Sequence, residues 1–142
     1  MKILVCISYV TDTTSKISFK ENNTRFNSEG VQYIIGPYDD YALARAVEIK
    51  EKTGSSVSVL NVGKDETEVV LRKALAIGAD EAYRINEDPI DSKHVAFQIS
   101  NFIKSNSYDL IMMGKESIDY NGGLVHHMVG ENLEIPCINP VM

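Results

Sequence analysis

The residues with the clearest capacity for chemistry form one polar, glycine-bearing stretch, Gly114–Gly123. It follows an apolar run typical of a buried strand and precedes a segment with helical periodicity. Gly122 and Gly123 carry no side chain, so main-chain amides there can approach an anion closely, and the dipole of the following helix favours negative charge. The pattern fits a nucleotide-binding loop and, equally well, a plain strand-to-helix turn.

Sharper motifs are absent from the sequence. The Gly-Lys pair in this stretch lacks the flanking glycine and Ser or Thr of a Walker A loop, and no Gly-x-Gly-x-x-Gly follows the first apolar run. His126 and His127 differ by about 100° around a helix, which favours surface or interface histidines over a metal site. Asp39 and Asp40 are interpreted as helix-capping residues rather than an acid–base pair. The sequence shows no recognisable catalytic group.

The elements that must position these residues alternate along the chain. Strands separated by helices of ten or more residues predict an α/β fold with a doubly wound, parallel, five-stranded sheet. The predicted strands are 3–7, 57–62, 81–85, 109–113 and 136–138. The predicted helices begin at Asp39 or Asp40, at Asp65 or Thr67 (apolar face Val70, Leu71, Ala74, Leu75 and Ile77), at Asp91 or Ser92, and at Gly123 (ending at Asn132).

One segment, 16–35, interrupts this alternation. Its apolar residues flank the polar tip Glu21–Thr24, which predicts a β-hairpin insertion after the first strand. Ligands of open parallel sheets bind outside the carboxyl ends of the strands. The segments expected there are 8–12, 61–64, 84–86 and 114–123.

Composition sets the broad class. The chain has 142 residues, 44% hydrophobic and 24% charged, as expected for one globular domain spanning 1–142. A net charge of −6 argues against a nucleic-acid partner and a polybasic membrane surface, and no apolar run is long enough to insert into a membrane. Cys6 and Cys137 lie in apolar runs, so we expect a buried, reduced pair in a cytoplasmic protein.

Four colinear motifs resemble the β subunit of the electron transfer flavoproteins. The first is the 114–119 loop followed by Asn121-Gly122-Gly123. The others are 2–7 with Val10 and Asp12, then 37–46, then 71–81. The resemblance covers essentially the whole chain. Members of the family are normally longer, so the chain resembles their N-terminal portion and is expected to lack the C-terminal arm that reaches the partner subunit.

The resemblance implies an electron-carrier subunit rather than an enzyme. It implies a heterodimer with an α subunit that holds most of the redox FAD, and electron delivery from acyl-CoA or other flavin dehydrogenases. The β subunit would bind AMP in simple members or a second FAD in electron-bifurcating members. Without the C-terminal arm, this length alone is not expected to transfer electrons.

The resemblance implies nucleotide contacts in four stretches of the chain. Backbone groups would flank the adenine, polar side chains would lie near the ribose, and the amides of 122–125 would bind the phosphate. These residues are Cys6; Gly36, Pro37, Tyr38 and Asp39; Val62; and Gly114, Lys115, Glu116, Ser117, Ile118, Asp119, Tyr120, Asn121, Gly122, Gly123, Leu124 and Val125.

The chain departs from the family pattern at three places. Gly36 replaces a common Asn, Leu124 replaces a Gln, and His126-His127 replaces small residues. Two alternatives stay open: a stand-alone adenine-nucleotide module similar to universal stress proteins, and an ATP-splitting ligase of the pyrophosphatase type. The sequence lacks the glycine-rich phosphate pattern of the first and the Ser-Gly-Gly loop of the second.

Overall fold

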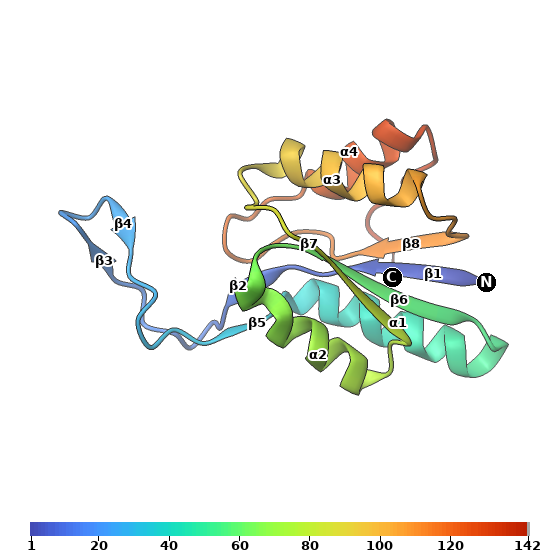
Figure 1. Cartoon of the computed structure of the whole chain (residues 1–142), viewed down its shortest axis with the longest axis horizontal. Coiled ribbons are helices and arrows are strands. Elements are labelled where there is room, and N and C mark those ends of the chain that lie inside the picture. Colours follow the sequence, from blue (N-terminus) through green and yellow to red (C-terminus); the bar gives the residue numbers. More distant parts are fainter. Residues whose placement is uncertain (142) are drawn as a thin grey trace.

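Four parallel strands form the central sheet of the computed structural model, which describes residues 1–141. Their spatial order is β7-β6-β1-β8 (Figure 1), and all three neighbouring pairs are parallel. The strands are β1 (Lys2–Cys6), β6 (Ser56–Val62), β7 (Glu81–Ile85) and β8 (Leu110–Met113). The first four predicted strands are therefore present.

Helices cover both faces of this sheet. Successive strand residues point to opposite faces, and apolar side chains on each face pack against helices. On one face, Ile3 and Val5 pack with α1 (Pro37–Thr53) and α2 (Glu68–Ile77), the latter preceded by the short helix η1 (Asp65–Thr67). On the other face, Leu4 and Cys6 pack with α3 (Ser92–Lys104) and α4 (Val125–Leu133). Figure 1 shows these two helix layers on opposite sides of the strands.

The direction of winding changes between β1 and β8. The chain builds β1, β6 and β7 outward in one direction and then places β8 on the other side of β1. The connection after β1 leads to α1 on one face, and the connection after β8 leads to α4 on the opposite face. Diverging connections leave a crevice at the carboxyl edge, where ligands of such sheets bind.

The predicted fifth strand at 136–138 is wrong. No strand follows α4 in the described chain, and the central sheet has four strands. The chain leaves α4 with Glu134 in the left-handed region (φ 55°), and the amide of Ile135 donates to the carbonyl of Gly130. The thiol of Cys137 then lies 3.6 Å from the His126 carbonyl. These contacts hold the start of the segment against α4.

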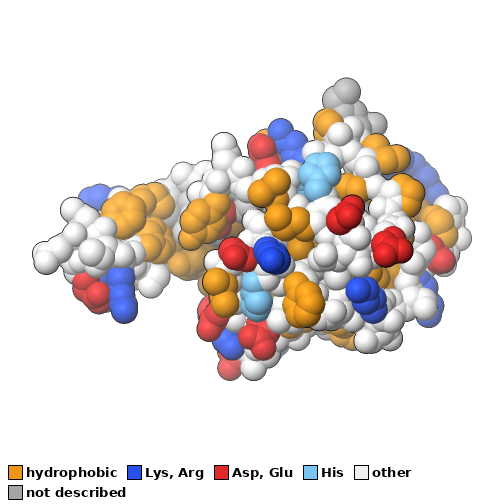
Figure 2. All heavy atoms as spheres, turned by 90° about the horizontal axis from the view of Figure 1, so that it is seen from above, with side chains coloured by type: hydrophobic (Ala, Val, Ile, Leu, Met, Phe, Trp, Pro, Cys, Tyr) orange, Lys and Arg blue, Asp and Glu red, His pale blue; other side chains and the backbone are white. Residues whose placement is uncertain are grey.

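The 16–35 segment lies within a longer excursion made of two short antiparallel pairs, where the sequence predicted one hairpin. Strand β2 (Tyr9–Thr11) pairs with β5 (Tyr33–Ile35), and farther out β3 (Phe19–Lys20) pairs with β4 (Arg25–Phe26). The outer pair projects from the body as an arm (Figure 1), and Figure 2 shows hydrophobic side chains exposed on it.

Several local predictions need correction. Helix α1 begins after Gly36, which has no side chain that could cap it, and the carboxylate of Asp39 bonds to Ser8 and Gly114 instead of capping the helix. Helix α4 begins at Val125 rather than at Gly123. Leu75 and Ile77 are exposed on α2, whose buried residues are Val70, Leu71 and Ala74.

The two cysteines do not form the buried pair expected from the sequence. Cys6 is buried in the sheet, but Cys137 is exposed because its segment lies on the outside of α4. Within residues 1–141, every helix is too short or too polar to cross a membrane.

Candidate functional site

A cleft of about 610 Å³ opens at the carboxyl edge of the sheet. It receives residues from the ends of β1, β6 and β8 and from the segment leading into α3. It therefore lies at the change of winding direction between β1 and β8, where the fold leaves room for a ligand.

Asp39 joins three of the chain segments around this cleft. The side chain, from the first turn of α1, is only 9% exposed. Its Oδ2 accepts hydrogen bonds from the amide of Ser8 (2.9 Å) and from the Ser8 hydroxyl (2.5 Å). Its Oδ1 accepts a bond from the amide of Gly114 (2.9 Å). One carboxylate thus ties the end of β1 and the end of β8 to α1.

Burial determines the acid–base behaviour of this group. Removal from water raises the pKa of Asp39, because the charged form loses hydration. The bonds from Ser8 and Gly114 oppose that rise by stabilising the carboxylate. Burial also raises the pKa of the Cys6 thiol, with a smaller contribution from the nearby Asp39 charge. Cys6 is therefore a neutral thiol at the cleft wall.

Two glycines allow the close approach of Asp39 to the loops. A Cβ atom at Gly114 would lie 2.5 Å from Oδ1 of Asp39 and 2.9 Å from the carbonyl carbon of Tyr38. A Cβ atom at Gly36 would overlap the Ser8 hydroxyl and lie 2.6 Å from Oδ2 of Asp39. Side chains at either position would separate the loops, which accounts for the glycine at position 36.

The loop after β8 is ordered by its own polar contacts. The amide of Ser117 donates to the carbonyl of Gly122 (3.0 Å), which closes the loop. The Ser117 hydroxyl donates to the carboxylate of Asp119, which also accepts from the amide of Tyr120 (2.8 Å). Asn121 adopts a left-handed conformation (φ 54°) at the tip, as asparagine tolerates better than most residues.

Lys115 does not face the cleft. Its ammonium group lies 3.4 Å from a carboxylate oxygen of Glu116 and 4.8 Å from the centre of the Tyr38 ring. Ion pairing with Glu116 raises the pKa of Lys115. The side chain is 45% exposed, so it matches the description of a surface lysine better than that of a phosphate ligand.

The amides of residues 122–125 lie where the loop enters α4. Within residues 1–141, none of these four amides donates a hydrogen bond to another protein group. Free amides at a helix N-terminus suit an anion. The charged side chains around the cleft are mostly acidic, which does not favour an anion: they are the carboxylates of Asp39, Glu66, Asp91, Glu116 and Asp119 and the ammonium of Lys64.

The structure brings part of the predicted site together around the cleft. The lining includes Cys6, Asp39, Val62, Gly114, Glu116, Ser117, Asp119, Tyr120, Gly122 and Val125. The predicted residues outside the lining are Gly36, Pro37, Tyr38, Lys115, Ile118, Asn121, Gly123 and Leu124.

Sequence reasoning assigned no ligand-binding role to several residues that line the cleft, although it named Thr67 and Ser92 as possible helix starts. Thr67 precedes α2, and Pro89, Ile90 and Ser92 lead into α3. Their available signal was position, because each follows the carboxyl end of β6 or β7. Asn61 also lines the cleft, within a segment expected at the carboxyl edge but without an assigned role.

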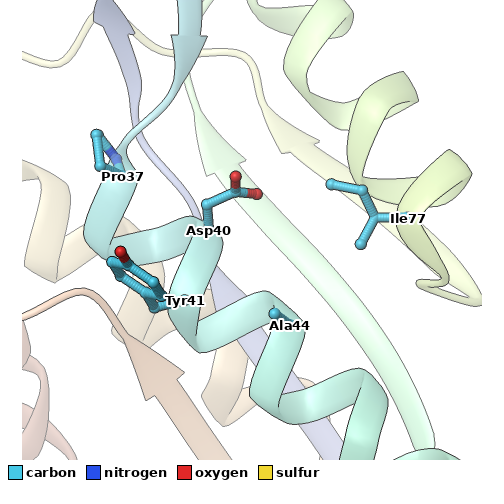
Figure 3. Close-up of a pocket in the computed structure, with 5 residues that line it drawn as sticks. All are labelled: Pro37, Asp40, Tyr41, Ala44 and Ile77. Carbon is cyan, nitrogen blue, oxygen red and sulfur yellow. The ribbon is translucent and has the colours of Figure 1, made fainter.

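A second hollow, of about 410 Å³, lies on the outer side of α1 (Figure 3). Pro37, Asp40, Tyr41 and Ala44 line it from α1, and Ile77 faces it from α2. Pro37 therefore faces away from the cleft, although it lies two residues before Asp39.

Comparison with known proteins identifies the family. Residues 24–142 match the family described as "Electron transfer flavoprotein domain". The chain belongs to the electron transfer flavoprotein family. Similar proteins include the "Electron transfer flavoprotein subunit beta" of Bacillus subtilis, 35% identical over 99% of this chain and 56% of the relative. The subunit of the same name from Thermoanaerobacterium thermosaccharolyticum is 37% identical over 99% of this chain and 55% of the relative.

A third relative carries a different name. The "Acryloyl-CoA reductase electron transfer subunit gamma" of Anaerotignum propionicum is 29% identical over 96% of this chain and 53% of its own length. The chain thus spans about half the length of the curated relatives it matches.

Proposed function

We propose that this chain is the nucleotide-binding part of an electron transfer flavoprotein β subunit, with an adenine nucleotide in the carboxyl-edge cleft. The nucleotide is AMP or the adenylate portion of a second FAD. The cleft at the change of winding direction is the observation that carries this proposal. Family membership supports it.

The residues around the cleft fit such a ligand in three parts. The unbonded amides of 122–125 offer donors to a phosphate at the start of α4. Asp119 and Gly122 line the cleft from the loop that leads into α4, so the Asp119 carboxylate and the Gly122 backbone would contact the ribose. The apolar walls contributed by Cys6 and Val62 suit a flat base.

Charge favours a ligand with few phosphates. The cleft is lined by the carboxylates named above and by one ammonium group, that of Lys64. Each additional phosphate brings further negative charge toward those carboxylates, and like charges repel most strongly where water is partly excluded. This supports a monophosphate or a dinucleotide over a triphosphate such as ATP.

The proposed role is structural support for electron transfer. The chain would hold its nucleotide as a fixed element and pack against an FAD-bearing α subunit, and the pair would take electrons from flavin-dependent dehydrogenases. FAD supplies the redox chemistry when bound. In the chain itself, Asp39 keeps the loops after β1 and β8 at a fixed separation, and the loop after β8 presents its amides to the phosphate.

The test is to identify the nucleotide that the purified protein retains. Heat denaturation followed by chromatography should release AMP or FAD in a ratio to protein near one. Isothermal titration of nucleotide-free protein should then show binding of AMP and much weaker binding of ATP. Release of ATP, or an absence of heat with AMP and with FAD, would contradict the proposal.

A further inference from the structure

Cys137 and His127 form a thiol–imidazole pair on the surface of the protein. Both residues are exposed, and Sγ of Cys137 lies 3.7 Å from Nδ1 of His127. This arrangement places a nucleophile and a base within hydrogen-bond distance for sulfur. Among residues 1–141, no third His, Cys, Asp or Glu joins the pair in an arrangement that could hold a metal ion. The pair is therefore better suited to thiol chemistry than to metal binding.

The chain after α4 holds the two residues together, although ten positions separate them. Glu134 turns the chain in the left-handed region (φ 55°), and the amide of Ile135 donates to the carbonyl of Gly130 (3.0 Å). A Cβ atom at Gly130 would lie 2.9 Å from Cβ of Cys137, so a glycine is needed where the returning chain lies this close to the helix. The geometry of the pair is thus set by the fold.

The thiol hydrogen of Cys137 has two acceptors within reach. One is Nδ1 of His127, and the other is the carbonyl oxygen of His126, 3.6 Å from Sγ. When the neutral imidazole carries its own proton on Nε2, Nδ1 can accept the thiol proton. The thiolate is the reactive form of cysteine, and an adjacent base generates it. Cys6 provides the contrast within the same chain, because it is buried and burial raises the pKa of its thiol.

We propose that Cys137 is a modification site that forms a mixed disulfide with small-molecule disulfides such as oxidised glutathione, with His127 as the general base. His127 takes the thiol proton, and the Cys137 thiolate attacks one sulfur of the reagent. A bond forms between Sγ and that sulfur, the original S–S bond breaks, and the second half of the reagent leaves as a thiolate, which receives the proton from His127. Cys137 is oxidised and the released half of the reagent is reduced. Neither residue is among those that line the cleft, so this reactivity is independent of the proposed nucleotide.

The first test incubates the folded protein with oxidised glutathione and locates the adduct by mass spectrometry of its peptides. The adduct should form on Cys137, and a reducing thiol should remove it. Cys6 should stay unmodified until urea unfolds the chain. An absence of adduct on Cys137, or modification of Cys6 before Cys137, would overturn the proposal.

The second test measures the rate constant of this reaction in the folded variants. His127→Gln retains a polar side chain that cannot take up a proton, so the rate constant should fall about fivefold or more, less than the ~10²–10⁴ of a fully aligned general base. Gly130→Ala should cause a similar fall, because its new Cβ displaces Cys137 from His127. His94→Gln is the matched control, the same substitution at a histidine whose ring lies 3.3 Å from Gln98, and it should keep the unmodified rate.

The same measurements in urea separate the effect of the pair from the intrinsic reactivity of the cysteine. Once the fold no longer holds Cys137 beside His127, the unmodified protein and the three variants should react at one rate. An unchanged rate in folded His127→Gln would overturn the assignment of the base. A fall of the same size in urea would also overturn it, because the effect would then not come from the folded pair.

Discussion

Replacing Gly114 with alanine tests how tightly the loop after β8 is held against α1. The new Cβ would lie 2.5 Å from Oδ1 of Asp39 and 2.8 Å from its amide nitrogen. Neither atom can move freely, because the amide is part of α1 and Asp39 is also bonded to Ser8. The loop must therefore shift, which would lengthen or break the bond from the Gly114 amide to Asp39.

The expected cost has two contributions. A hydrogen bond to a charged group contributes about 1.5–3 kcal/mol, and overpacking a well-packed position costs about 1–3 kcal/mol. Because the shift that relieves the overlap also weakens the bond, the two do not add fully. We expect Gly114→Ala to lower the free energy of unfolding by about 2–4 kcal/mol.

Gly122→Ala is the matched control in the same loop. A Cβ at Gly122 would have no atom within 4 Å, and Gly122 is not in the left-handed region. Its free energy of unfolding should stay within about 0.5 kcal/mol of the unmodified protein. If the backbone at Gly122 approaches a phosphate closely, this variant should nevertheless bind AMP more weakly.

Urea unfolding followed by far-ultraviolet circular dichroism measures both variants, with the midpoint and slope reported separately. Titration with AMP gives the binding data. A Gly114→Ala protein as stable as Gly122→Ala would refute the argument that Asp39 and Gly114 fix the separation of these elements.

Three further predictions follow from burial. Asp39→Asn should lower stability by about 1–3 kcal/mol near neutral pH, because one amide oxygen cannot replace all three acceptor interactions. Burial raises the pKa of Asp39, so the unmodified protein gains stability from this group as pH falls through the folded pKa toward the ordinary value of 3.8. Urea titrations should therefore show a larger loss of unfolding free energy in the Asn variant at pH 4–5 than at pH 7. An equal loss at both pH values would contradict the burial argument. A thiol reagent should label Cys137 rapidly and Cys6 only on unfolding; equal labelling rates in the folded protein would show that β1 is not protected. Leu43→Ala, at a fully buried position of α1, should cost about 2–5 kcal/mol, whereas Leu75→Ala on exposed α2 surface should cost under about 1 kcal/mol in the same urea experiment.

The sequence by itself determined the order of the main elements. The continuous apolar run at 3–7 and the mainly apolar run at 57–62, which also contains Ser58 and Asn61, predict strands, and the structure confirms them as β1 and β6. These runs are informative because a parallel strand covered on both faces is mostly apolar along its whole length. Alternation with helices then implies the parallel, doubly wound arrangement that the structure shows.

Only the tertiary structure decided what the polar residues do. Asp39 fits a helix cap in the sequence, yet it bonds to Ser8 and Gly114, which are 31 and 75 positions away. Asn61 gave no local signal, because its unpaired oxygen is apparent only when the surrounding chain is in place. Hydrophobic periodicity depends on neighbours along the chain, whereas hydrogen-bond partners depend on which strand ends lie close together in the folded protein. The cleft is formed by strand ends that are distant in the sequence, so its chemistry depends on the tertiary structure.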